Sequence, residues 1–455
     1  MNSPEFLTNH NGKIYAPWEK NLNRIMMPFE RFVKHQATAG LLLMATALCA
    51  LIIANTELLP LYKALLHMPI GIQLADWTLE KSLHHWVNDG LMVLFFFIVG
   101  LELKREILVG ELSNIKAAIL PICAAVGGMI VPALIYTMIN LNSNHLNGWG
   151  IPMATDIAFA LGVIALLAGR IPKALITFLV AVAIVDDLGA VLIIALFYTD
   201  TLVWSYLIGA LALPLFMVGA NLSGIRSSSI YFFLGALLWL ALLKSGVHAT
   251  LAGVITAFTI PTLPRHNPDA FSQRTRELLQ QFEATYADPN ENILKNQRMV
   301  ALSQTMEDGI KGLTTPLQRL EHRMHFPVAF IVLPMFALFN AGITIDHAQL
   351  ADNLLKPVTA GVGLGLFFGK VLGITGFSWL ALKLKLSTLP PEVTLKHITG
   401  ASLLASIGFT MSIFITELAF IGEAELILQA KLGILISSLV SGILGYIWLY
   451  KLHRL

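Results

Sequence analysis

The stretch that decides the fold is residues 178–197, FLVAVAIVDDLGAVLIIALF, in which Asp186 and Asp187 are the only charged side chains. A helix of about 20 mostly apolar residues is long enough to cross the hydrocarbon core of a bilayer. Ionisable groups at that depth are costly and usually mark a functional site. Successive helix residues point about 100° apart, so the two carboxylates can offer oxygen ligands to a small hard cation such as Na⁺. Because two close acids repel each other, protons compete with that cation for the site.

The composition of the whole chain is that of a membrane protein. Of its 455 residues, 56% are hydrophobic and 13% are charged, whereas soluble domains average about 25% charged residues. The net charge of +2 gives no indication of a nucleic-acid partner. Twelve apolar segments predict an all-α membrane protein with twelve transmembrane helices, centred near Thr46, Phe95, Gly128, Leu161, Ile184, Ala212, Leu237, Gly253, Leu333, Phe367, Ile407 and Leu439.

The distribution of Lys and Arg predicts how these spans are oriented. With both termini in the cytoplasm, 24 of the 30 basic residues fall on the cytoplasmic side and five on the opposite side, as the positive-inside rule requires. The chain then divides into a cytoplasmic N-terminal segment (1–35), spans 1–8 (36–261), a long cytoplasmic loop (262–325), and spans 9–12 with a short cytoplasmic tail (326–455). Residues 17–36 are compatible with an amphipathic surface helix or with a simple leader. The long loop is expected to hold two surface helices, at 267–286 and 304–326.

Lys370 is a second charge in the middle of an apolar span. A buried ammonium group requires a negative partner, and the aspartates of span 5 are the obvious candidates. A lysine that pairs with an aspartate and releases it when a cation arrives would act as a proton carrier. The alternative is a side chain that extends to the membrane interface.

Two spans are interrupted by polar residues. Span 4, IPMATDIAFALGVIALLAG at 151–169, contains Thr155 and Asp156, and span 11, GASLLASIGFTMSIFI at 400–415, is interrupted at 406–410. Unwound backbone survives at membrane depth only where protein or a water-filled cavity covers it, and paired interruptions indicate the ion site of a transporter. We expect spans 4 and 11 to be discontinuous, within inverted-topology repeats formed by spans 3–5 and 10–12. Asp156 would then neutralise facing helix N-termini and Lys370 facing C-termini; a simple helix cap is the alternative for Asp156.

The remaining titratable candidates each allow two interpretations. Glu102 lines a cytoplasmic funnel or belongs to an interfacial charge cluster. His248 responds to pH near neutrality or is a packed hydrogen-bonding residue. A group of one acid and two imidazoles either senses cytoplasmic pH or forms an ordinary solvated helix end: Glu321, His322 and His325.

The sequence contains no P-loop, no Cys/His metal cluster and no Ser/His/Asp arrangement in a supporting context. We therefore expect a protein that is not an enzyme and needs no cofactor, with membrane lipid and small cations as its partners. Three function classes remain. They are a secondary cation/proton exchanger, a Na⁺-coupled symporter of an organic solute, and a membrane sensor with 262–325 as its output module. The exchanger is favoured because acids and a lysine converge without further groups that would recognise a solute.

Six motifs, in chain order, resemble the NhaA family of bacterial Na⁺/H⁺ antiporters: MATDIAFALGV, AIVDDLGAV, LKSGVHATLAGV, LPMFALFNAGI, FFGKVLGI and GFTMSIFI. The resemblance covers roughly residues 36–450. It implies a homodimeric inner-membrane protein that exports Na⁺ or Li⁺ in exchange for protons by alternating access, electrogenically and with activity at alkaline pH.

The resemblance also implies roles for individual residues. Asp186 and Asp187 match the cation- and proton-binding pair, Lys370 the partner of the first aspartate, and Thr155 and Asp156 the crossing of the broken helices. Glu102 matches a funnel acid, His248 a pH-responsive histidine, and LEHRMH (320–325) a pH-sensing segment. The loop 262–325 and the N-terminal 35 residues look longer than in the best-known members.

Overall fold

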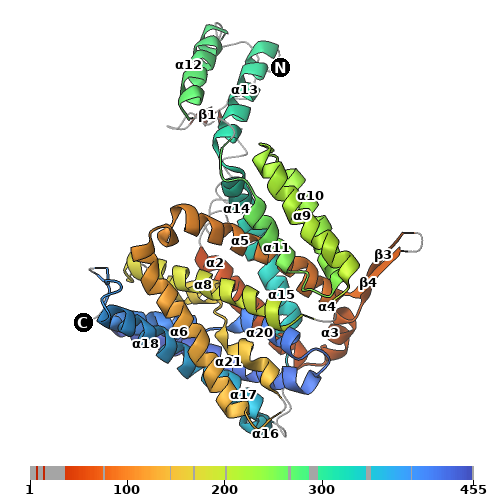
Figure 1. Ribbon diagram of the computed structural model, residues 1–455, viewed down its shortest axis with the longest axis vertical. Helices are drawn as coiled ribbons and strands as arrows, with labels where there is room; N and C mark the ends of the chain where they lie inside the picture. Colours follow the sequence, from red (N-terminus) through yellow and green to blue (C-terminus); the bar gives the residue numbers. More distant parts are fainter. Residues whose placement is uncertain are drawn as a thin grey trace. The chain divides into compact units, whose positions relative to one another are not determined.

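The computed structural model describes residues 7–8, 14–15, 36–74, 77–143, 145–167, 170–199, 202–264, 268–285, 296–344, 350–390 and 392–452. In these ranges the chain is mostly helical (Figure 1). Two antiparallel strand pairs occur, β1 (Leu7–Thr8) with β2 (Ile14–Tyr15) and β3 (Pro69–Leu74) with β4 (Trp77–Ser82). The surface helix considered for residues 17–36 falls almost wholly outside the described residues.

The chain folds into two compact units that interleave along the sequence. Unit 1 comprises residues 1–66, 119–190 and 333–455, and unit 2 comprises residues 67–118 and 191–332. Two long helices pass from one unit to the other, α6 (Ile115–Asn140) and α8 (Lys173–Phe197).

Unit 1 contains the two interrupted spans. Its other helices bury large parts of their surfaces against one another; α2 packs on α7, and α21 packs on both α17 and α19. Besides most of α6 and α8, the elements of this unit are α2 (Gln36–Ala54), α3 (Leu59–Leu66), η3 (Leu146–Met153), α7 (Ile157–Ala165), α15 (Leu333–Asn340), α16 (Leu350–Leu355), α17 (Pro357–Leu364), η6 (Gly365–Gly369), α18 (Lys370–Lys383), α19 (Leu395–Ala405), α20 (Phe409–Ala419) and α21 (Ala424–Leu452).

Unit 2 has its own apolar core, in which α5 packs on α11 and α9 lies beside α10 (Figure 1). Phe97, Met217, Tyr231 and Leu317, from four different helices, meet in this core. Besides β3 and β4, the elements are α4 (Leu83–His85), η1 (Trp86–Leu91), α5 (Met92–Val109), η2 (Glu111–Ser113), α9 (Trp204–Leu222), α10 (Ser228–Ser245), α11 (Leu251–Thr259), α12 (Pro268–Thr285), α13 (Gln297–Leu313), α14 (Pro316–Pro327) and η5 (Val328–Val332).

The long loop differs in part from its sequence prediction. The helix expected at 267–286 is present as α12, and α12 and α13 run side by side (Figure 1). The second predicted helix, at 304–326, is two helices. α13 ends at Leu313, and Thr315 begins α14 with a capping box that it shares with Gln318. A capping box followed by Pro316 starts a new helix, and this local signal outweighs the continuous amphipathic pattern.

In the described residues, eight helical segments are long and apolar enough to cross a membrane, or up to ten if each bent helix pair is one span. The multi-pass architecture predicted from composition is therefore confirmed, while the count of twelve stays a prediction. Two of the twelve predicted centres fall on helices that do not pass this test. α5 carries Glu102, Lys104, Arg105 and Glu106, and α11 has nine residues.

The two predicted interruptions are confirmed. In span 4, η3 is followed by extended backbone at Ala154 (ψ 148°) before α7 begins. In span 11, α19 and α20 are separated by residues 406–408 and bend by 49°. A third bend, of 114° between α2 and α3, has no counterpart in the sequence predictions.

Candidate ion-binding site

The two interrupted spans meet at their breaks. The backbone N–H of Asp156 donates a hydrogen bond of 2.6 Å to the carbonyl of Ile407. The first group precedes α7 and the second follows α19, so unwound backbone of one span is paired with unwound backbone of the other. This pairing satisfies polar groups that a bilayer could not.

Asp156 lies at the N-termini of two helices. One carboxylate oxygen accepts the backbone N–H of Phe159 in α7 at 2.9 Å. The other accepts the backbone N–H and the hydroxyl of Thr410 in α20, at 3.0 and 2.6 Å. The side chain is buried. Because helix N-termini carry partial positive charge, a carboxylate at this position compensates both ends. Asp156 is also the N-cap of α7, so the structure is compatible with both interpretations from the sequence.

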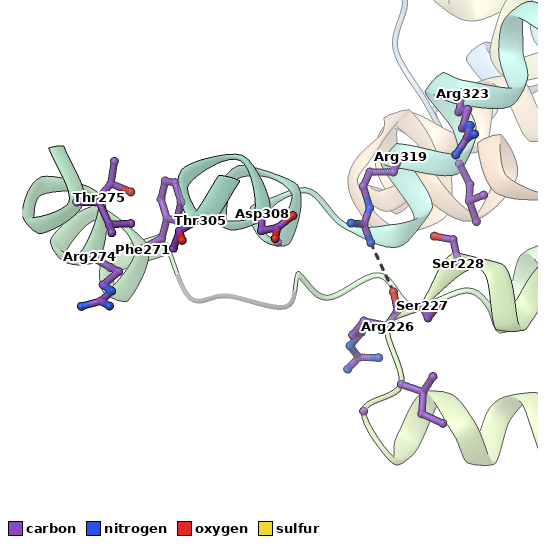
Figure 2. A pocket seen from close by; sticks show the side chains of 16 residues that line it. Arg226, Ser227, Ser228, Phe271, Arg274, Thr275, Thr305, Asp308, Arg319 and Arg323 are labelled. Carbon is purple, nitrogen blue, oxygen red and sulfur yellow. Dashed lines mark hydrogen bonds between the residues drawn. The ribbon is translucent and has the colours of Figure 1, made fainter. Parts of the chain in front are cut away.

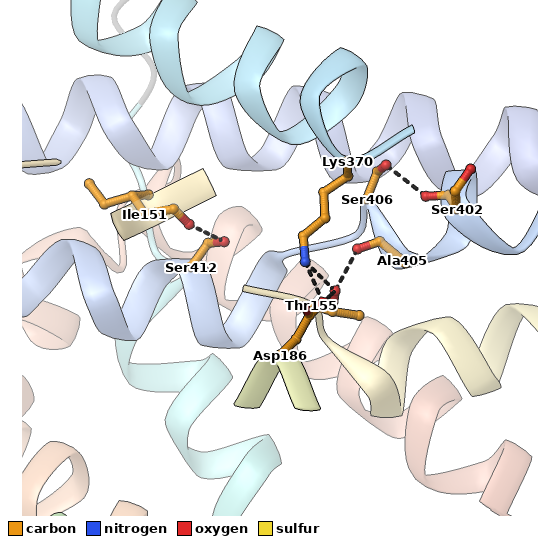
Figure 3. A network of polar contacts seen from close by, with 8 residues as sticks. All are labelled: Ile151, Thr155, Asp186, Lys370, Ser402, Ala405, Ser406 and Ser412. Atoms are coloured by element: carbon orange, nitrogen blue, oxygen red, sulfur yellow. Dashed lines mark hydrogen bonds and ion pairs between the residues drawn. The ribbon is translucent and has the colours of Figure 1, made fainter. Parts of the chain in front are cut away.

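Lys370 and Asp186 form an ion pair in which neither side chain is exposed (Figure 3). Lys370 is the first residue of α18, and Asp186 lies in the middle of α8. Pairing offsets part of the free-energy cost of burying the two charges, which either charge alone would bear in full. The predicted partnership between Lys370 and an aspartate of span 5 is thus present, and extension of Lys370 to the membrane interface is excluded by its burial.

The hydroxyl of Thr155 joins this pair to the end of α19. Its oxygen lies 2.8 Å from a carboxylate oxygen of Asp186, 2.8 Å from the carbonyl of Ala405 and 2.9 Å from the ammonium group of Lys370. A hydroxyl has one proton to donate. While it accepts from Lys370, it can donate to Asp186 or to Ala405, but not to both. The Thr155 hydroxyl thus links the ammonium group of Lys370 to the C-terminal end of α19. That Lys370 neutralises facing helix C-termini stays a prediction.

The site retains oxygen atoms that can take a further ligand. The second carboxylate oxygen of Asp186 is buried and accepts no hydrogen bond from any described residue. Asp187, the next residue of α8, is also buried. Among the described residues no three His, Cys, Asp or Glu side chains converge in a way that could hold a resident metal ion. A monovalent cation that passes through the site would be a cargo, taken by carboxylate and hydroxyl oxygens.

Close packing of α6 and α18 fixes the position of Lys370. A side chain on either Gly127 or Gly373 would collide with the backbone of the other. Likewise, a Cβ on Gly369 would lie 2.6 Å from the Cα of Pro132. Backbones approach this closely only where both residues lack bulky side chains, so these glycines place the first turn of α18 directly against α6.

Unit 2 brings together a separate group of sequence-predicted residues. The guanidinium group of Arg105 in α5 contacts Glu106 at 2.9 Å and Glu321 in α14 at 3.1 Å. Glu102 is half-buried and within electrostatic range of these three side chains. On α14, His322 lies in the same range of Glu321 and of His325. Packing of α14 on α5 therefore assembles Glu102, Glu321, His322 and His325 into one cluster.

His248 does not join this cluster in any described contact. It is half-buried between α10 and α11 and interacts electrostatically with Asp89 in η1. Asp89 is also within range of His84 and His85. His248 therefore belongs to a group of residues around Asp89.

Two hydroxyl residues of α20, Thr410 and Ser412, contact span 4. Thr410 ends the predicted interruption at 406–410 but no role was predicted for it, and Ser412 was not among the candidates. Both are buried. The available signal was weak, since Thr and Ser within FTMSIFI are common in membrane helices as donors to their own backbone. Lys104 was counted only as a topology marker, yet its ammonium group donates to the carbonyls of Phe258 and Ile260 at 2.6 Å each and so caps α11.

Comparison with known proteins identifies the family of the chain. The sequence model of the Na⁺/H⁺ antiporter 1 family matches residues 30–449. The chain belongs to this family. Similar proteins include an NhaA 1 antiporter of Saccharophagus degradans, 60% identical over 96% of this chain and 94% of the relative. NhaA antiporters of Sulfurimonas denitrificans and Helicobacter pylori are 49% and 42% identical, each over 96% of this chain and 98% of the relative. The expected NhaA membership is therefore confirmed, and with it a multi-pass membrane protein of a transporter family.

Proposed function

We propose that the protein exchanges cytoplasmic Na⁺, or Li⁺, for external protons by alternating access around Asp186 and Asp187. The observation that carries this proposal is the fully buried ion pair of Lys370 and Asp186 at the crossing of two broken spans. Membership of the NhaA family, whose relatives are named as Na⁺/H⁺ antiporters, supports it.

The arrangement of Lys370, Asp186 and Thr155 supports a proton-loaded state of the following kind. Lys370 is charged and neutralises Asp186, and the hydroxyl of Thr155 accepts from the ammonium group. Asp187, buried on the same helix, holds a proton, because a second unneutralised carboxylate beside the first would be unfavourable at this depth. The site then has no net charge.

In the cation-loaded state, a Na⁺ ion replaces these protons. Asp187 loses its proton, and Asp186 turns from Lys370 to the cation, using the oxygen that accepts no hydrogen bond from a described residue. Lys370, without its partner in a site that excludes water, then favours its neutral form and releases a proton. Exchange of two protons for one cation moves net charge, so transport is electrogenic.

Asp156 takes no part in the proton balance of this cycle. Its carboxylate is committed to three donors from α7 and α20, which keeps the crossing intact while the site is open to either side. Thr155, in contrast, contacts the reacting groups directly and would be a ligand of the cation.

In unit 2, the cluster around Arg105 would attract cations at the cytoplasmic mouth and respond to pH. Glu102 would supply negative charge to a funnel, and Glu321, His322 and His325 would change their charge with cytoplasmic pH. His248, beside Asp89, would provide a separate response. The close association of Glu102 with Glu321 and Arg105 supports one coupled group.

The architecture that fits this function has twelve spans and inverted repeats, with both termini in the cytoplasm, in the bacterial inner membrane and as a homodimer. The two broken spans, η3–α7 and α19–α20, support the repeats, and the excess of Lys and Arg in the predicted cytoplasmic segments supports the orientation. In this arrangement α5 and α11 supply two of the spans.

The test is Na⁺-dependent proton release from everted membrane vesicles containing the protein, followed with a fluorescent ΔpH probe. Addition of Na⁺ or Li⁺ should dissipate the pH gradient, more strongly at alkaline than at neutral pH. K⁺ should have no effect. Failure of both cations at every pH from neutral to alkaline would refute the proposal, and stimulation that needs an organic solute would favour symport.

A further inference from the structure

Ser412 makes a contact that mirrors the one made by Thr155. The hydroxyl of Ser412 in α20 donates to the carbonyl of Ile151 in η3 at 2.9 Å, and the hydroxyl of Thr155 lies 2.8 Å from the carbonyl of Ala405, the last residue of α19 (Figure 3). The last carbonyls of a helix have no partner within that helix. Each broken span therefore supplies one hydroxyl to the open carbonyl end of the other.

The Ser412 contact is buried and directed. Neither Ser412 nor Ile151 is exposed to solvent, and the backbone N–H of Ser412 is already used by the carbonyl of Gly408. Serine in a membrane helix commonly donates to its own backbone, but here the hydroxyl reaches another element. A side chain on Gly408 would collide with this hydroxyl, so the glycine leaves space for the contact.

The contact fixes one end of the segment that carries Thr155. Ile151 lies four residues before Thr155, and the chain between them passes from η3 into extended backbone at Ala154. At its other end the segment is held by the bond from Asp156 N–H to the carbonyl of Ile407. Between these two anchors η3 ends at Met153, and Ala154 and Thr155 belong to no helix.

We propose that Ser412 is a positioning residue of the ion site. Its hydroxyl fixes the segment from Ile151 to Thr155, so that the Thr155 hydroxyl stays in contact with both Asp186 and Lys370. Loss of the anchor would leave the Ile151 carbonyl buried without its donor, and the segment would relax to satisfy it. The effect on transport rests on the proposed Na⁺/H⁺ exchange, whereas the effect on the segment does not.

Ser412→Ala tests this proposal, with Thr416→Val as the matched control. Thr416 lies one turn further along α20 and is equally buried, but its hydroxyl donates at 2.8 Å to the carbonyl of Ser412 in its own helix. Both variants remove one buried hydroxyl from the same helix. Only Ser412→Ala removes a bond to span 4.

Two measurements are made on the wild type and both variants. Hydrogen–deuterium exchange on the purified full-length protein reports the amides of residues 151–156. Vesicle assays give the half-saturating Na⁺ concentration and the maximal rate. Loss of a buried hydrogen bond shifts an equilibrium by at least about fivefold. We therefore expect Ser412→Ala to accelerate deuterium uptake in this segment and to raise the half-saturating Na⁺ concentration by that factor, while Thr416→Val matches the wild type.

Unchanged deuterium uptake in Ser412→Ala would overturn the proposal. So would faster uptake with an unchanged half-saturating Na⁺ concentration, since the anchor would then not position the ion site. A wild type that shows no Na⁺-dependent exchange refutes the proposed function. In that case the role of Ser412 as an anchor is still tested. It holds if Ser412→Ala, and not Thr416→Val, accelerates deuterium uptake in residues 151–156.

Discussion

Two ion pairs in this molecule have similar chemistry and very different surroundings. In unit 1, the side chains of Lys370 and Asp186 are both 0% exposed. In unit 2, Arg105 pairs with Glu321 at 3.1 Å with side-chain exposures of 42% and 16%. Water and salt screen the second pair, whereas the first interacts at low dielectric. The comparison suggests that a buried pair can couple proton and cation binding, because removal of either partner leaves an uncompensated charge, while an exposed pair can only adjust the response.

The largest effect is expected at Asp187, beside the buried pair. Asp187→Asn should reduce Na⁺-dependent exchange to the level of vesicles without the protein, because an amide neither releases a proton nor supplies a carboxylate to the cation. The control is Asp352→Asn, which changes an exposed acid of α16 and should exchange like the wild type at equal protein amount. Substantial exchange by Asp187→Asn would remove this residue from the cycle.

The next effect separates breaking the buried pair from removing it. Lys370→Met should lower the free energy of unfolding by about 3–5 kcal/mol, because Asp186 is left buried without its partner. The double variant Lys370→Met with Asp186→Asn should recover much of this loss, as measured by thermal unfolding in detergent. Additive losses in the double variant would show that the two charges do not depend on each other, and the comparison would fail.

A smaller effect is expected at the cap of the two broken helices. Thr410→Val removes one of the three donors to the Asp156 carboxylate and should lower the free energy of unfolding by about 1.5–3 kcal/mol, the usual value for a hydrogen bond to a charged group. Thr177→Val is the control, because its exposed hydroxyl donates only to its own helix at the carbonyl of Lys173. Equal unfolding temperatures for the two variants would contradict this role of Thr410.

The smallest effect is expected in the exposed pair. Arg105→Gln should change the free energy of unfolding by about 1 kcal/mol or less, and less still at high ionic strength. The measurement is thermal unfolding at low and high choline chloride, which varies ionic strength without adding Na⁺. A loss as large as that of Lys370→Met would mean that solvent exposure does not distinguish the two pairs.

The candidate site shows how far sequence analysis reaches. Charged residues in apolar runs identified Asp186, Lys370 and Asp156, and the polar interruptions located both broken spans, because hydropathy and helix breaking are local properties of the chain. The partners of these residues are not local. Lys370 lies 184 residues from Asp186, and Thr410 lies 254 residues from Asp156. The pairing of Lys370 with an aspartate of span 5 was nevertheless predicted, because a buried ammonium group requires a negative partner. The contact of Thr410 with Asp156 was not, because contacts over such separations depend on which helices pack together.

Some features of the fold were not predicted from the sequence. The break between α13 and α14 had a local signal, the capping box at Thr315 and Gln318, which the amphipathic pattern concealed. The sharp bend between α2 and α3 also had a local signal, the polar residues 55–57 followed by Pro60, whereas the division into two interleaved units had none. A long hydrophobic run predicts that a helix forms and lies in the membrane. When all faces of that helix are about equally apolar, the sequence does not indicate which helix packs against each face.

The sequence by itself determined that this is a multi-pass membrane protein with three acids, a lysine and two broken spans at positions that a bilayer disfavours. It could do so because the cost of burying a charge or an unpaired backbone group applies at every position of a span. The tertiary structure decided which groups share that cost. It pairs Lys370 with Asp186 and lets the carboxylate of Asp156 accept hydrogen bonds at the N-termini of two helices. It also brings the hydroxyls of Thr155 and Ser412 each to a carbonyl of the other broken span. These choices follow from the close approach of helices, which no single stretch of sequence contains.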